Sequence, residues 1–341
     1  MGILDWFKNR PSQSDSDRLS DEMTLRAVDK AVTLTNPRLK LVRSYQERLV
    51  PAVEISVRYL RGKMLELPSA IRISEANWAS EPVLRAFFAS ASEIPAAFGR
   101  SRNLRTLFDK FPELDEACLV LGMTYNEQQV YGMSLRGDIV QRDIAQTVVD
   151  FSVPRTRICG HTDAEVRHLL GTQSFEYLVA QAMIEIGEAR SERQELAETR
   201  ALIRSRLRLL QQQGPGLGSV FDVAPAVTDE QQKLEAQLLE NERQMEEMGG
   251  PQSALEEELD CLREVLEHPE CYIRFERNKL RLSTLNVVLD DTSTDVSSDV
   301  VFSLVNLDGV PKVRRAFILG CLARSDLPVA RMNFEDAARY L

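Results

Sequence analysis

Cys159, His161 and His168 are the residues whose types and spacing come closest to a metal site. Thiolates and imidazoles bind Zn²⁺, but a structural zinc site needs four ligands, commonly as two close pairs. The chain has three histidines and five cysteines, and no second pair stands at ligand spacing. Thr162 and Glu165 instead have the spacing of a helix-capping box. The sequence therefore predicts the start of a helix here, and it predicts no metal and no cofactor.

The glycine-rich segment 214–218 is the place where a phosphate-binding loop would be sought. Such a loop follows a strand and ends in Gly-Lys-Ser/Thr, and this sequence has neither feature. The chain also lacks the Gly-x-Ser-x-Gly motif of a nucleophile elbow. Asp290 and Asp291 lie together, but in a polar connection. The sequence thus identifies no catalytic residue and favours a protein that is not an enzyme.

Binding of nucleic acid would use the mildly basic residues 1–110. The arginines there are dispersed at helical spacing, without the aromatic residues that would form stacking platforms between them. The formal net charge of the whole chain is −10. The sequence argues against a nucleic-acid partner.

The first ten residues form an apolar segment that could contact a membrane or another protein. Ile3, Leu4 and Phe7 share one face of a helix, and Trp6 borders that face. Burying these four side chains is worth roughly 6 to 10 kcal/mol, whereas ordering ten residues costs about 10 kcal/mol or more. These magnitudes favour docking of the segment on the protein's own core, and a weak, reversible contact with a membrane or with another protein is the alternative.

A second apolar segment holds Leu217, Val220, Phe221 and Val223 between glycines and prolines. These side chains lie between two long helical segments, where they are hard to bury locally. We expect them to bind another protein. Folding back on the helices, or contact with a second subunit in a homo-oligomer, remains open.

Two long helical segments flank this apolar segment and would position it. Each has an apolar seam with heptad spacing. Steps of three and four residues link the apolar positions of each seam, which is the pattern of a coiled coil. The sequence predicts an antiparallel coiled-coil hairpin over 174–267 with its tip at 214–227. The seam positions run from Phe175 to Leu210 and from Leu234 to Leu266.

The register of this hairpin follows from its polar positions. Pairing Leu207 with Leu234 and Ile203 with Leu238 sets Arg200 opposite Asn241, the two most polar central positions. A shift by one heptad would bury the charge of Arg200 against an apolar side chain, which costs several kcal/mol. We therefore predict that Arg200 and Asn241 form one polar layer.

The negative charge of the chain is concentrated in one segment. Residues 214–268 hold 14 Asp/Glu and 3 Lys/Arg. The first seam carries arginines along the positions that face this segment, so we expect the acidic residues to form ion pairs within the hairpin.

The remaining pattern divides the chain into four parts and places it in the α+β class, predominantly helical. Residues 1–20 are the apolar segment and a polar linker. Residues 21–173 are mainly helical, with a small β element, a hairpin near 127–160. The long antiparallel coiled-coil hairpin follows, and residues 268–341 form a C-terminal antiparallel sheet of four strands with a terminal helix.

Cysteine usage and hydropathy indicate where the protein is found. The five cysteines are far apart and include no Cys-x-x-Cys pair, so we predict reduced thiols and no disulfide. No run reaches the ~20 apolar residues of a membrane span. The first residues also lack the pattern of a secretory signal. The sequence predicts a cytoplasmic protein, with peripheral membrane association as an additional alternative.

These observations favour a non-catalytic scaffold or adaptor that acts through protein–protein contacts of the coiled-coil hairpin. The alternative is an enzyme or ligand-binding protein whose pocket lies within residues 38–170 and uses residues dispersed along the chain.

Overall fold

The computed structural model describes residues 21–136, 139–212, 225–248, 251–290, 296–309 and 311–328. These residues divide into two compact units. Unit 1 contains residues 21–23, 55–176 and 268–328, and unit 2 contains residues 24–54 and 177–267. The division falls within three helices, α1 (Asp21–Thr35), α2 (Tyr45–Glu66) and α6 (Asp163–Gln212).

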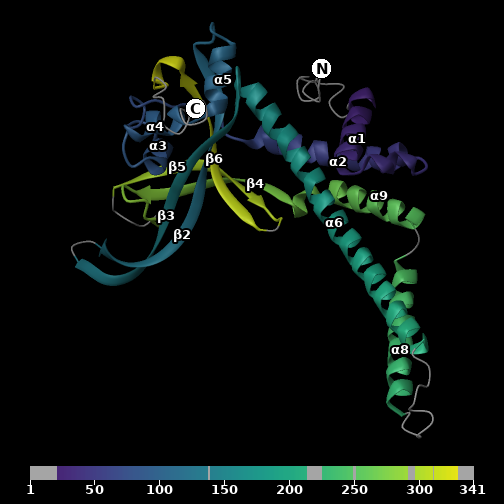
Figure 1. The fold of residues 1–341 in the computed structure, drawn as a ribbon. Coiled ribbons are helices and arrows are strands. Elements are labelled where there is room, and N and C mark those ends of the chain that lie inside the picture. The colour runs from purple at the N-terminus through teal and green to yellow at the C-terminus, as the bar shows by residue number, and fades with distance from the viewer. Residues whose placement is uncertain are drawn as a thin grey trace, which may run out of the picture. The chain divides into compact units, whose positions relative to one another are not determined.

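Unit 1 is built on a single six-stranded sheet (Figure 1). The strand order is β3-β2-β6-β5-β4, and β1 pairs with β6 in parallel. All other neighbours are antiparallel. The strands are β1 (Ile71–Arg72), β2 (Glu116–Arg136), β3 (Ile139–Gly160), β4 (Ile273–Ser283), β5 (Ser297–Leu307) and β6 (Val313–Ala323).

The pairing of β2 with β6 joins distant parts of the chain. Its register runs from Glu116 opposite Ala323 to Thr124 opposite Arg315. On its other edge, β6 pairs first with β5, through residues 313–317, and then with β1. Gly320 is needed at the β1 contact, because a Cβ there would lie 2.3 Å from the Ile73 side chain.

Short helices pack against this sheet and complete the core of unit 1. Four aromatic rings meet there: Phe87 from a helix, Tyr125 from β2, Phe151 from β3 and Phe302 from β5. The ring centroid of Phe151 lies 4.7 Å from that of Phe87 and 5.3 Å from that of Phe302. The helices of this unit are α3 (Pro82–Phe87), α4 (Glu93–Gly99), α5 (Arg102–Lys110), η3 (Pro269–Cys271) and η4 (Arg324–Asp326).

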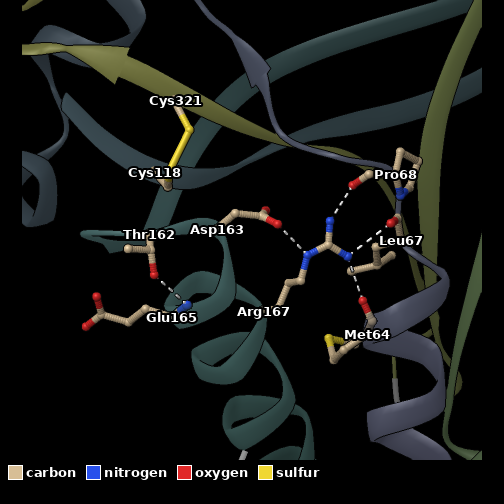
Figure 2. Close-up of polar contacts among 9 residues, drawn as sticks. All are labelled: Met64, Leu67, Pro68, Cys118, Thr162, Asp163, Glu165, Arg167 and Cys321. Carbon is tan, nitrogen blue, oxygen red and sulfur yellow. Dashed lines mark hydrogen bonds and ion pairs between the residues drawn. A yellow bond between two sulfur atoms is a disulfide. The ribbon is translucent and has the colours of Figure 1, made fainter. Parts of the chain in front are cut away.

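Cys118 and Cys321 form a disulfide across β2 and β6 (Figure 2). The two residues are register partners, and their Cα atoms are 4.1 Å apart. The prediction of no disulfide is therefore wrong. The two cysteines are 203 residues apart in sequence, and only the strand pairing brings them together.

Arg167, in the second turn of α6, caps the end of α2 (Figure 2). Its guanidinium donates hydrogen bonds to the carbonyls of Met64 at 2.7 Å, Leu67 at 3.0 Å and Pro68 at 2.7 Å. Its Nε donates to Asp163 Oδ2 at 2.8 Å. The last carbonyls of a helix have no partner within it, and a cation there also interacts favourably with the helix dipole.

The start of α6 follows the predicted capping pattern. The hydroxyl of Thr162 accepts a hydrogen bond from the Glu165 amide at 3.2 Å (Figure 2). The Glu165 carboxylate accepts from the backbone amide of His161 at 2.8 Å, one residue earlier than in a standard capping box. This cap begins a helix of 50 residues.

Unit 2 consists of helices. They are α1 from Thr24, η2 (Pro37–Leu41), α2 up to Glu54, α6 from Tyr177, α8 (Pro225–Glu247) and α9 (Pro251–Glu267). Residues 249–250, between α8 and α9, lie outside the described part of the chain.

The predicted fold class is wrong in how it divides the chain. Its small β element and its C-terminal sheet are one sheet, because β3 pairs with β2, and β2 pairs with β6, which continues the sheet to β5 and β4. Residues 268–328 contribute three strands instead of the predicted four, because Ile273–Ser283 is a single strand. The predicted first arm is part of a single helix that begins at Asp163, and the second arm is two helices. Strand pairing between remote segments leaves no periodic pattern in a sequence.

None of the helices in the described part of the chain is both long enough and apolar enough to span a membrane.

The Arg167 cap provides a test of the packing in unit 1. We expect Arg167→Met to lower the free energy of unfolding by about 2 to 4 kcal/mol, because three carbonyls lose a charged donor. Arg58→Ala, at an exposed position of α2, is the control and should change it by less than about 0.5 kcal/mol. Urea unfolding followed by circular dichroism measures both. An effect of Arg167→Met no larger than the control would show that these carbonyls do not depend on the guanidinium.

Candidate functional site

Glu258 on α9 is the main polar contact of the helices in unit 2. Its carboxylate accepts hydrogen bonds from Arg190 Nε and Nη2 of α6, both at 2.6 Å, and from Asn36 Nδ2 at 2.6 Å. Burial raises the pKa of Glu258, but the hydrogen bonds from Arg190 and Asn36 outweigh it and lower the pKa below its usual value. A second ion pair, between Arg48 and Asp260 at 2.7 Å, ties α2 to α9.

Beyond this point α6 runs beside α8 (Figure 1). Ile203 and Leu207 of α6 and Leu234 of α8 are buried in one cluster, against which Leu210 and Leu238 pack. Heptad spacing places all five residues on the predicted seams. A two-helix contact of this kind covers only one stripe of each helix and leaves the outer faces exposed.

Arg200 and Asn241, the predicted polar layer, both lie in this helix pair. Asn241 is buried, and its amide group donates a hydrogen bond to the carbonyl of Leu196 at 3.1 Å. Among the described residues no hydrogen bond joins Arg200 to Asn241, and the buried Oδ1 of Asn241 has no partner. Pairing of these two side chains stays a prediction.

Arginines of α6 contact glutamates of α8 and α9. Arg204 Nη2 lies 2.6 Å from Glu242 Oε1, and Arg193 bonds to Glu257 and, at 3.0 Å, to the carbonyl of Met248. These pairs neutralise part of the acidic segment. Because most of these groups are partly exposed, each pair contributes little to stability, and their main effect is to orient the helices.

Three leucines on the outer faces of this pair are exposed. The exposed fractions are 54% for Leu202, 57% for Leu209 and 71% for Leu239. Leu202 and Leu209 are seven residues apart on α6, so they lie two turns apart along one face. Spacing of this kind is how an amphipathic helix presents anchors to a partner.

The other predicted contact residues lie outside the described part of the chain. These are Leu217, Val220, Phe221 and Val223 at the predicted tip, and Ile3, Leu4, Trp6 and Phe7 in the first segment.

The residues considered for metal binding lie at the start of α6. His161 Nδ1 is 3.0 Å from Glu165 Oε2, and the ring of His161 packs edge-on against Phe111. Cys159 is partly buried among the hydrophobic residues of the sheet, and burial raises the pKa of its thiol. Within the described ranges, no group of three or more His, Cys, Asp or Glu side chains is arranged to hold a metal ion.

A cavity of about 700 Å³ in unit 1 is a candidate for a ligand pocket. Its wall combines residues of the 78–93 region with Asp150 and Phe151 and with residues of the 282–300 region. Polar groups in the wall bond to the main chain: Trp78 Nε1 donates to the carbonyl of Phe88, and Asn286 Nδ2 donates to that of Ala86. These two hydrogen bonds order the wall.

A smaller cavity, of about 410 Å³, is lined by four arginines that sequence analysis did not select. They form two similar tripeptides, Arg100-Ser101-Arg102 and Arg155-Thr156-Arg157. The repeated Arg-Ser/Thr-Arg pattern was the available signal. This repeat does not by itself indicate a site, because only the fold brings the two tripeptides to one cavity.

Comparison of the chain with protein-family models, with curated proteins and with solved structures gives no match.

The seam between α6 and α8 provides the next test. Leu207→Ala should lower the free energy of unfolding by about 2 to 4 kcal/mol, because Leu207 is buried. Leu209→Ala, on the exposed face of the same helix, should cost less than about 0.5 kcal/mol. The double variant Leu207→Ala/Leu234→Ala should cost less than the sum of its two single variants, because the side chains share one cluster. Equal, small effects at positions 207 and 209 would contradict the buried seam.

Proposed function

We propose that this chain is a non-catalytic scaffold or adaptor that binds another protein through the helix pair α6 and α8. The observation that supports it is the exposure of Leu202, Leu209 and Leu239 on a pair whose own seam is narrow. Full burial of a leucine is worth about 1.5 to 3 kcal/mol. These three leucines are already partly covered. Burying the rest of each side chain under a partner would therefore contribute roughly half of this free energy per leucine.

Charged residues beside the leucines would set the orientation of the partner. Arg243 of α8 contacts Glu240 at 2.7 Å and also Glu247, and these groups are exposed. Exposed charges add little affinity, but they guide encounter and register. The partner surface that fits this description is an apolar groove or helix face with a mixed-charge rim.

The leucines give a direct test. The variant Leu202→Glu/Leu209→Glu/Leu239→Glu should retain at most about a tenth of the wild-type amount of captured protein, because each leucine anchor is worth about 1 kcal/mol or more. The assay is quantitative mass spectrometry of proteins captured from extracts of the native host, with helix content and melting temperature measured in parallel.

The matched control adds the same three charges at small exposed positions of the same helices, as Ala197→Glu/Ser205→Glu/Ala236→Glu. It should bind within about twofold of wild type. A second copy of this chain as the partner would appear as a change from dimer to monomer in light scattering. Equal capture by both variants would reject α6 and α8 as the binding element.

The proposal also places the protein in the cytoplasm, with a weak membrane contact through Ile3, Leu4, Trp6 and Phe7. The Cys118–Cys321 disulfide argues in the opposite direction, because reducing compartments keep most thiols free. Alkylation of thiols in intact cells separates the two. Free Cys118 and Cys321 thiols are the expected result for a cytoplasmic chain, and a disulfide trapped at once in living cells would assign it to an oxidising compartment.

A further inference from the structure

The two Arg-Ser/Thr-Arg tripeptides meet at one cavity of unit 1. The first lies where α4 ends and α5 begins, and the second lies in β3, which is an edge strand of the sheet. Four arginines, Arg100, Arg102, Arg155 and Arg157, line the cavity of about 410 Å³. Residues more than 50 positions apart thus contribute equally to one basic site.

Specific hydrogen bonds hold the two halves of this site together. Ser101 Oγ donates to the carbonyl of Thr156 at 3.2 Å, and Asn103 Nδ2 donates to that of Arg157 at 2.6 Å. Arg105 fixes the link between α4 and α5 through two bonds, at 3.0 and 2.9 Å, to the carbonyl of Gly99. Ser101 is buried, and these hydrogen bonds, which fix the main chain of the cavity wall, come from side chains other than those of Arg100, Arg155 and Arg157.

All charged side chains in the described lining of this cavity are positive. All four arginines are exposed, and the cavity wall formed by described residues contains no Asp or Glu. No ion pair joins Arg100, Arg155 or Arg157 to another described residue. The positive charges of Arg100, Arg155 and Arg157 repel each other around one cavity, in a chain whose net charge is −10. An anion with several charges would remove this repulsion.

The chemistry of the lining selects among anions. Guanidinium groups bind phosphate oxygens in a bidentate manner, and several of them suit an anion with more than one phosphoryl group. A volume of about 410 Å³ lies within the range of small-molecule sites. The lining has no aromatic side chain among its described residues, so it offers no platform for stacked nucleic-acid bases.

We propose that this cavity, formed by Arg100, Arg102, Arg155 and Arg157, binds the diphosphate group of a small ligand. Free pyrophosphate and the diphosphate of a nucleotide share this chemistry. The site lies in unit 1, and it is independent of the helix-pair contact proposed above.

Isothermal titration of the full chain with pyrophosphate, ADP and orthophosphate tests the site. Wild type should bind pyrophosphate or ADP at least tenfold more tightly than orthophosphate, since a second phosphoryl group engages further guanidinium groups. Tighter binding of ADP than of pyrophosphate would identify a nucleotide as the source of the diphosphate, and the reverse order would identify pyrophosphate. Absence of binding to both, or equal binding of orthophosphate, would overturn the proposal.

Two sets of variants assign the binding to this cavity. Arg155→Gln/Arg157→Gln and, separately, Arg100→Gln should each weaken pyrophosphate binding, the double variant by about tenfold or more. The control Arg58→Gln/Arg277→Gln removes the same charge from exposed arginines elsewhere in unit 1, and it should change binding less than twofold. If the control weakens pyrophosphate binding equally, the loss of binding comes from the change in net charge and not from this cavity, which would contradict the proposal. Stronger competition by a single-stranded RNA oligomer than by pyrophosphate would make the site a nucleic-acid surface and would also overturn the proposal.

Discussion

The antiparallel pairing of β2 with β6 is the constraint on which unit 1 depends. It aligns residues 116–124 with residues 315–323 and so closes a loop of about two hundred residues. Closing a loop of this length costs conformational entropy, but the cost grows only slowly with length. The nine aligned residue pairs and the aromatic core around Phe151 and Phe302 repay it. Without this pairing β3 would have no place in the sheet, and the cavity between β3 and α5 would not form.

Both units bury apolar side chains, and they differ in their polar contacts. Unit 1 has a continuous hydrophobic core with contributions from five strands and three helices, and its polar contacts, such as the Arg167 cap, serve mainly to satisfy backbone carbonyls. In unit 2, α1, α2, α6 and α9 bury apolar side chains such as Val28, Leu49, Val179 and Leu262, whereas the pair of α6 and α8 has only a narrow apolar seam beside its ion pairs. Arg190 and Glu258 form the most buried of these pairs. Because the seam between α6 and α8 uses only one stripe of each helix, the outer faces of this pair can bind a partner while the seam stays intact.

The two proposed surfaces differ in the forces they would use. Leu202, Leu209 and Leu239 offer apolar area, which favours another protein and depends little on salt. The arginine cavity offers charge and directional donors, which favour a small phosphorylated ligand and depend strongly on salt. Because the first surface lies on unit 2 and the second on unit 1, a chain with both would combine a protein contact with ligand recognition, as a ligand-responsive adaptor does.

Local patterns in the sequence were sufficient for the helices and their contact stripe. Heptad spacing identified Ile203, Leu207 and Leu234, and the Thr162 cap marked the start of α6, because helix periodicity and capping act between residues a few positions apart. Tertiary structure alone decided the single sheet, the Cys118–Cys321 disulfide and the meeting of the two arginine tripeptides. Each of these depends on which strands become neighbours. The alternation of apolar and polar residues along a strand shows which face of the strand is buried, but it does not identify the neighbouring strand.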